Sequence, residues 1–231
     1  MRYQPLEGAL RATVWPEVPA YGVADAASEA LAWVLDRAGF EASENADSRP
    51  ASYWRARALM YLGVLAVRTT RAAMAVLAIG YEAESMGFKR TLMEAHSRVR
   101  KVAADASGEY ARRWLQGRAG KPAKAVGPFS PDELWEMLSH SSHADHRAIE
   151  NFLAVSEPDG STRFLIAPER RLEVTNPTLA VFAGETRDIA NVIAHEHGLT
   201  IPHLAELDAA IAAHFPYAHG DGPGDQPGPA G

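Results

Sequence analysis

The chain has 231 residues, of which 47% are hydrophobic and 23% charged, a composition typical of a globular protein with a substantial core. It contains no cysteine, which excludes disulfide bonds, thiolate metal ligands and a cysteine nucleophile. The net charge of −6 conceals a basic middle, because residues 55–124 hold fourteen Lys and Arg against five Asp and Glu. Such a segment predicts either a surface that binds RNA or another polyanion, or helices that pair with acidic helices of the same chain.

The first half of the chain predicts helices behind an irregular start. Residues 1–22 contain three prolines and no sustained hydrophobic period, so they predict an N-terminal arm. Apolar residues at helical spacing then predict helices over residues 25–38, 50–79, 81–106 and 109–116. The apolar face of the second of these is broad enough to predict nearly complete burial. We expect no membrane span, because Arg68 and Arg71 interrupt its most apolar stretch, and we expect a cytoplasmic protein because the N-terminus has no signal-like apolar region.

The second half adds a change of pattern. Two short apolar runs around EPDGST predict a β-hairpin within residues 151–167. A helix is then expected to open at Asn176-Pro177 and to end at Gly198, and the last one to begin at Pro202. The Gly- and Pro-rich residues 217–231 predict a disordered tail.

The predicted fold class is therefore all-α. We expect an antiparallel helical bundle with one inserted β-hairpin, formed by a single domain over residues 23–216.

The stretch LSHSSHADHR, residues 138–147, is the densest polar segment and lies on a predicted helix. On that helix Ser139, His143, His146 and Glu150 share one face at spacings that let the side chains touch. Two imidazoles and a carboxylate can ligate zinc or iron, so His143, His146 and Glu150 are candidate metal ligands. A solvated helix flank is the alternative. A Ser139–His143–Glu150 hydrolytic triad is disfavoured, because a mid-helix serine lacks the sharp turn and oxyanion donors of a nucleophile.

The stretch RTLMEAH, residues 90–96, is a second polar constellation. Arg90 and Glu94, followed by Leu138-Ser139 and His143, resemble an uncharacterised bacterial family of helical-bundle proteins. Its members pair an Arg-x-x-x-Glu helix with a later Leu-Ser-x-x-x-His helix, a hairpin and a closing helix, and the resemblance covers about residues 55–198. The family is similar in outline to the HEPN superfamily, many of whose members are ribonucleases with an Arg-x(4–6)-His motif. Arg90 and His96 match that motif in form.

This resemblance implies a metal-independent endoribonuclease that acts on RNA in stress or defence, needs no cofactor and works as a homodimer. Its polar centre would contain the following residues: Arg90, Glu94, His96, Ser139 and His143. His96 or His143 would be the general base, and Arg90 would stabilise the phosphate. On a helical wheel, however, His96 falls at the edge of the core while Arg90 and Glu94 point away from it.

Three alternatives therefore stay open. Arg90 and Glu94 can form a solvated pair of a purely structural kind. The protein can be a non-catalytic module that dimerises or binds a partner through its basic face. It can also be a metal-binding bundle.

Overall fold

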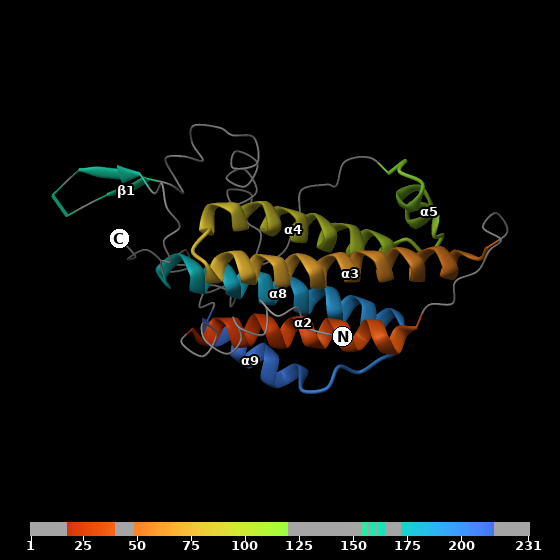
Figure 1. The fold of residues 1–231 in the computed structure, drawn as a ribbon. Helices are drawn as coiled ribbons and strands as arrows, with labels where there is room; N and C mark the ends of the chain where they lie inside the picture. Colours follow the sequence, from red (N-terminus) through yellow and green to blue (C-terminus); the bar gives the residue numbers. More distant parts are fainter. Residues whose placement is uncertain are drawn as a thin grey trace, which may run out of the picture.

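The computed structural model describes residues 18–39, 49–119, 154–156, 158–159, 161–164 and 172–214. Helix dominates these residues, which confirms the all-α class. Four long helices lie side by side: α2 (Pro19–Ala38), α3 (Ala51–Ala78), α4 (Glu82–Ala104) and α8 (Leu172–Glu196) (Figure 1). The shorter α5 (Glu109–Leu115) contacts α3 and α4, and α9 (Leu204–His214) contacts α2 and α8.

Cross-helix contacts fix the directions of the long helices. Arg55, near the start of α3, donates a hydrogen bond to the backbone oxygen of Val102 near the end of α4, and pairs with Glu196 at the end of α8. Helix α3 therefore runs antiparallel to both α4 and α8, which run parallel to each other. A long connection between α4 and α8 allows this parallel arrangement, whereas short connections would force neighbouring helices to alternate in direction.

Gly63 marks a close approach of three helices. A Cβ atom at this position would lie 2.6 Å from Cδ2 of Leu35 in α2 and 3.0 Å from Cδ1 of Ile193 in α8. The missing side chain therefore lets α2 and α8 pack directly against α3. Further along, Arg71 of α3 pairs with Glu29 of α2, so the residue order is reversed and these two helices are antiparallel.

The core lies among the four long helices. Its fully buried large side chains include these residues: Leu31, Leu59, Leu62, Leu77, Leu92, Leu179, Phe182 and Ile189. Helices α2, α4 and α8 each contribute buried apolar residues to this core, among them Leu31, Leu92 and Phe182. The expectation for α3 is wrong, because Tyr61, Val64 and Leu65 are 46%, 42% and 41% exposed. Helix α3 lies between α2 and α4 with α8 behind it, and α5 contacts its first part, so that an outer side of α3 is left uncovered by the described helices (Figure 1).

Two helices begin earlier than the sequence indicates. Helix α2 starts at Pro19, inside the predicted arm, because proline suits the first turn of a helix and Ala20, Tyr21 and Val23 are buried. Helix α8 starts at Leu172 rather than at Asn176, with the exposed Pro177 inside it. Only about one turn precedes this proline, and that turn is held in place by a hydrogen bond from Thr175 to α4.

The other helix boundaries agree within two residues of the predictions. Helix α3 begins after Pro50, α4 after Tyr81, and α5 at Glu109. Helix α9 begins at Leu204, two residues after the predicted start at Pro202, where the backbone of His203 has a positive φ of 55°.

Two three-residue strands pair antiparallel. Strand β1 (Ala154–Ser156) and strand β2 (Thr162–Phe164) place Ala154 opposite Phe164 and Val155 opposite Arg163. The bundle with an inserted hairpin, and the single domain over residues 23–216, stay predictions. Residues 1–17 and 217–231 lie outside the described residues.

Candidate functional site

The described part of the chain contains three of the predicted site residues. Arg90, Glu94 and His96 all lie on α4. The remaining candidates, for catalysis or for metal binding, lie outside the described residues: Ser139, His143, His146 and Glu150. Their roles stay predictions.

Arg90 and Glu94 form an ion pair on one side of α4. The Arg90 Nε atom donates to Glu94 Oε1 at 3.1 Å, and the two side chains are 26% and 30% exposed. Met86 and Met93, on the same flank of the helix as Arg90, are buried. The pair is therefore half-buried at the edge of a covered apolar surface, and solvent still reaches both charged groups.

His96 faces the core, against α8. Its Nδ1 atom lies 2.5 Å from Glu185 Oε2, and the two side chains are 7% and 1% exposed. An ionised carboxylate only accepts hydrogen bonds, so Nδ1 carries a proton whenever Glu185 is charged. The contact therefore fixes the orientation of the imidazole ring. It also keeps the ring away from any large substrate at the surface.

Lys89 lies two helical turns before His96 on the same side of α4 and is also buried. Burial lowers the pKa of its ammonium group from 10.5 to about 8, although the nearby charge of Glu185 acts in the opposite direction. Lys89, His96 and Glu185 are thus three titratable groups enclosed between α4 and α8. Of these three groups, only His96 was predicted from the sequence.

Hydroxyl contacts extend this buried polar region in both directions along the helices. Thr70 Oγ1 of α3 and Thr186 Oγ1 of α8 lie 2.7 Å apart, and both residues are buried. Near the other end of the region, Thr175 of α8 donates to Glu82 Oε1 of α4 at 3.0 Å. We refer to the whole set as the inner polar layer: Thr70, Glu82, Lys89, His96, Thr175, Glu185 and Thr186.

The structure therefore divides the predicted polar centre. Arg90 and His96 are six residues apart, which places their side chains roughly 120° apart around the helix axis. Arg90 and Glu94 remain together and accessible, whereas His96 belongs to the inner polar layer. One sequence signal could have revealed that layer. Glu82, Ser85, Lys89 and His96 repeat at spacings of three, four and seven residues, which puts four polar groups on the buried face of one helix.

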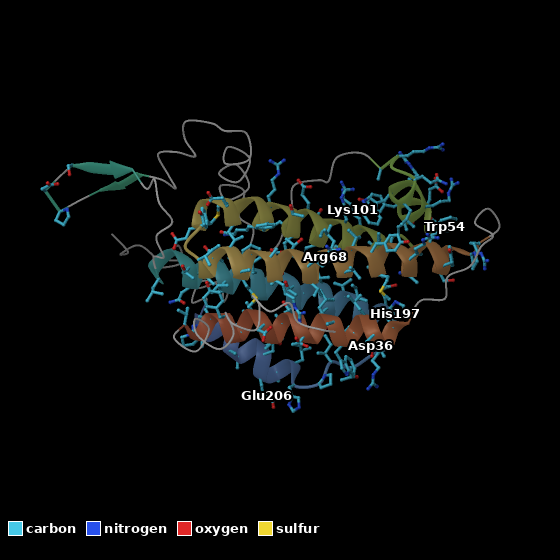
Figure 2. The ribbon with its side chains drawn as sticks, in the orientation of Figure 1. Asp36, Trp54, Arg68, Lys101, His197 and Glu206 are labelled. Atoms are coloured by element: carbon cyan, nitrogen blue, oxygen red, sulfur yellow. The ribbon has the colours of Figure 1, made fainter. Side chains whose placement is uncertain are left out.

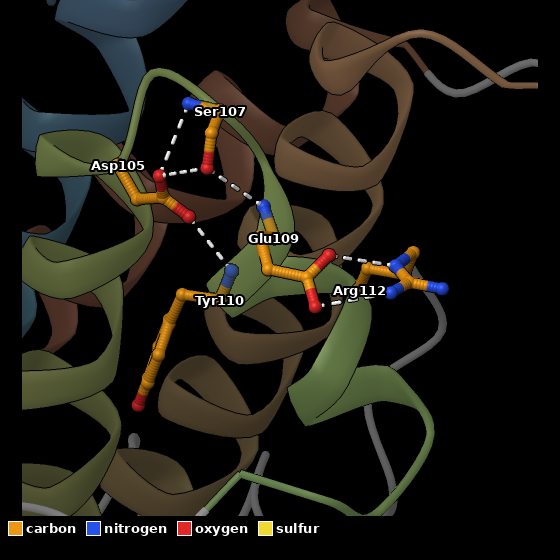
Figure 3. Close-up of polar contacts among 5 residues, drawn as sticks. All are labelled: Asp105, Ser107, Glu109, Tyr110 and Arg112. Carbon is orange, nitrogen blue, oxygen red and sulfur yellow. Dashed lines mark hydrogen bonds and ion pairs between the residues drawn. The ribbon is translucent and has the colours of Figure 1, made fainter.

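Helix α5 begins at a turn made of polar side chains (Figure 3). The Asp105 carboxylate accepts hydrogen bonds from the backbone amides of Tyr110 at 2.7 Å and of Ser107 at 3.0 Å. The Ser107 hydroxyl accepts one from the Glu109 amide at 3.2 Å. Hydrogen bonds from the Ser107 side chain and the Tyr110 amide lower the pKa of Asp105. Gly108 completes the turn, and two observations explain why this position is a glycine. Its φ is 70°, and a Cβ atom there would lie 2.7 Å from the backbone oxygen of Ala51.

This turn places α5 against the first part of α3 and adds cations to that end of the molecule. Arg112 pairs with Glu109, while Arg113 and Arg118 are exposed and form no ion pair with a described residue. Residues 49–119 as a whole hold thirteen Lys and Arg against five Asp and Glu. The basic surface of the molecule is therefore spread over α3, α4, α5 and the residues after α5.

A shallow pocket of about 370 Å³ lies between α2 and the residues that lead into α9. Trp33, Ile201 and Leu207 supply apolar lining, and Glu29 and His203 supply its charged or polar groups. Arg37 stacks over the Trp33 ring at 5.2 Å. The lining offers an apolar group a place to bind but brings together no acid–base pair, since Glu29 already pairs with Arg71.

Comparison of the chain with protein-family models, with curated proteins and with solved structures found no significant match. Within the described ranges, no group of three or more His, Asp or Glu side chains is arranged to hold a metal ion. By length and composition alone, α3 is apolar enough to cross a membrane, and half of its most apolar window is buried inside the structure. Core helices of soluble proteins also meet that criterion, so the observation is weak evidence.

Proposed function

We propose that this protein is a cytoplasmic, HEPN-like helical bundle with a hairpin inserted at residues 151–167, and that it binds RNA through its basic surface. The observation that carries the proposal is the set of arginines without acidic partners. Arg68 on α3, Arg113 on α5 and Arg118 after α5 are exposed and form no ion pair with any described residue. Cations of this kind release counterions when they contact phosphates, which is the main source of affinity for nucleic acids.

Internal charge pairing accounts for only part of the basic segment. Arg55 pairs with Glu196 and Arg71 pairs with Glu29, so two cations of α3 are neutralised by acidic groups of other helices. Most acidic groups of residues 49–119 are themselves occupied by local partners, as Glu94 is by Arg90. The positive charge that remains supports a polyanion as the partner.

Binding is tested with the full chain and a fluorescein-labelled single-stranded RNA of about 12 nucleotides. We expect anisotropy titrations to show an affinity that falls steeply as salt increases. Arg113→Gln combined with Arg118→Gln should weaken binding and reduce the salt slope by about 0.7 for each phosphate that the variant no longer neutralises. Arg37→Gln on α2 is the matched control, since Arg37 is exposed but lies in an acidic region. Absence of salt-dependent binding by the wild type would contradict the proposal.

A metal-independent ribonuclease is the second candidate, and the accessible Arg90–Glu94 pair favours it. Arg90 would stabilise the phosphate, and His143, with Ser139 nearby on the predicted helix, would take the role of base that the buried His96 is badly placed to fill. Such an enzyme is expected to act as a homodimer, with its cleft between two copies.

The ribonuclease candidate makes a separate prediction. Arg90→Ala and His143→Ala should each reduce cleavage of single-stranded RNA by about 10²–10⁴-fold, with EDTA having no effect. His96→Ala must be read together with its melting temperature, because this residue supports the core. If the wild type leaves RNA intact at concentrations where a dimer forms, the ribonuclease candidate is wrong and RNA binding without cleavage remains.

A further inference from the structure

The outer face of α3 carries a line of alternating cations and apolar or aromatic side chains. We call this the α3 strip: Tyr53, Arg57, Tyr61, Val64, Leu65 and Arg68. Arg57, Tyr61, Val64 and Arg68 are spaced by four, three and four residues, which keeps them on one side of the helix. This side is opposite the one that packs on α8 through Gly63 and Thr70. Arg68 is labelled midway along α3 in Figure 2.

Arginines and tyrosines of the strip contact each other along the helix axis. Arg57 donates to the hydroxyl groups of Tyr53 at 2.9 Å and Tyr61 at 3.2 Å, and its guanidinium lies 5.5 Å from the centre of the Tyr61 ring. Arg49, just before the helix, lies over the Tyr53 ring at 5.2 Å. These contacts hold the rings and the guanidinium groups in fixed positions while Tyr61 remains 46% exposed.

The charge that α3 itself contributes to this face is entirely positive. Residues 51–78 contain four arginines and neither Asp nor Glu. The two arginines outside the strip, Arg55 and Arg71, pair with carboxylates of α8 and α2. Arg68 forms no such pair within the part of the chain that the structure describes. A negatively charged ligand therefore suits this face, above all at Arg68.

We infer that the α3 strip is a binding site for single-stranded RNA, in which Arg57 and Arg68 contact phosphates and Tyr61 and Tyr53 stack against bases. This inference rests on the proposed RNA binding and assigns it to one surface. Single-stranded nucleic acids suit the pattern because they alternate charged phosphates with flat bases that stack on aromatic rings. A duplex hides its bases and offers the tyrosines nothing to stack on.

Two other occupants fit the strip less well. If a second copy packed its α3 antiparallel across a two-fold axis, Arg57 of one copy would face Arg68 of the other, and like charges would repel. At a membrane surface, an amphipathic helix carries its cations on a separate polar face. Here Arg57 and Arg68 lie in line with Tyr61 and Val64, so the apolar side chains cannot enter a bilayer without drawing the arginines in.

The test measures anisotropy of a fluorescein-labelled oligouridylate of about 12 nucleotides at several salt concentrations. Arg57→Gln combined with Arg68→Gln should reduce the salt slope by roughly 1.4, or 0.7 for each phosphate contact in single-stranded RNA. Tyr61→Ala should weaken binding about tenfold without changing the slope, because it removes stacking but no charge. Tyr61→Phe should bind as the wild type does, and Arg37→Gln is the control for an arginine elsewhere.

The outcomes separate this inference from the proposed function. If the wild type binds and only Arg113→Gln with Arg118→Gln weakens binding, RNA binding stands and the α3 strip is excluded as its site. If the wild type does not bind RNA, both fail. Co-sedimentation with phosphatidylserine vesicles that Tyr61→Ala abolishes, or a dimer that the strip variants dissociate, would overturn the inference if RNA binding is unaffected. Melting temperatures of all variants identify any loss of folding, and the arginine variants still decide the matter if Tyr61→Ala is unstable.

Discussion

The two acid–base pairs of α4 are close in sequence and differ in every physical respect. Arg90 and Glu94 are neighbours on one helix, and their side chains are 26% and 30% exposed to solvent. His96 and Glu185 come from helices far apart in the sequence and are almost fully enclosed. Solvent screens the first pair, while in the second pair burial leaves both groups with little solvent to replace the contact if one member is removed. Residue type alone therefore says little about what such a pair does for the protein.

Removing Glu185 should produce the largest effect. Glu185→Ala leaves the buried His96 without its hydrogen-bond partner and Lys89 without a nearby negative charge, so we expect a loss of about 3–5 kcal/mol in the free energy of unfolding. Urea denaturation followed by circular dichroism measures this value. Glu185→Gln, which keeps a hydrogen-bonding group, should lose clearly less. A urea midpoint of Glu185→Ala equal to that of the wild type would show that the pair contributes nothing to stability.

Lys89 should make stability depend on pH. Its pKa falls from 10.5 to about 8 in the folded protein, so between these values the unfolded chain binds more protons and stability rises with pH. Between pH 7 and pH 10 the free energy of unfolding of the wild type should therefore rise by on the order of 3 kcal/mol relative to that of Lys89→Met. Below about pH 8 both folded and unfolded wild type are charged at Lys89, and the cost of burial is fully present.

Urea midpoints at pH 7, 8, 9 and 10 measure this difference, with Lys101→Met on the same helix as the matched control. If the urea midpoints of the wild type and Lys89→Met change with pH in the same way, the Lys89 ammonium group is solvated and its pKa is not lowered by burial.

The hydroxyl contact between α3 and α8 should have an intermediate effect. Thr70→Val and Thr186→Val each leave one buried hydroxyl without its partner and should each cost about 1–2 kcal/mol. The double variant should cost less than the sum, because both polar groups are then replaced by methyl groups of the same shape. Thr91→Val, which removes a hydroxyl bonded to its own helix, is the control. Strict additivity in the double-mutant cycle would argue against a direct contact.

The accessible pair should matter least for stability. Arg90→Ala and Glu94→Ala should each change the free energy of unfolding by no more than about 0.5 kcal/mol, because solvent-screened pairs at this spacing contribute little. Thermal unfolding at low and high salt measures the change. A loss as large as that of Glu185→Ala would remove the distinction between the two sides of α4.

The sequence predicted one side of this comparison better than the other. Periodicity located α4 and placed His96 at the core edge, and the i,i+4 spacing predicted the Arg90–Glu94 contact, because both depend on local geometry alone. Glu185 was missed since it lies 89 residues from His96, and no local pattern links residues on different helices. Lys89 was missed because lysine is rarely assigned to a core.

Helix α3 shows a different limit of sequence reasoning. Its apolar residues surround the helix, which predicts burial on all sides, yet the neighbours that provide burial are set by tertiary packing. Tyr61 and Leu65 stay exposed because α2, α4 and α8 occupy the other sides. Likewise, the early start of α8 goes with the tertiary contact of Thr175 with Glu82, which no local pattern reveals.

Gly63 constrains how this chain can change over evolutionary time. By seating Leu35 and Ile193 against the backbone of α3, it fixes the rotation of that helix about its own axis. Each residue inserted into or deleted from α3 turns everything beyond it by about 100°. A single deletion between Gly63 and Arg68 would therefore swing Arg68 out of line with Arg57 and, if Gly63 keeps its place, also pull Thr70 away from Thr186. Point substitutions can accumulate on the outer face of α3, but its length between these positions cannot drift.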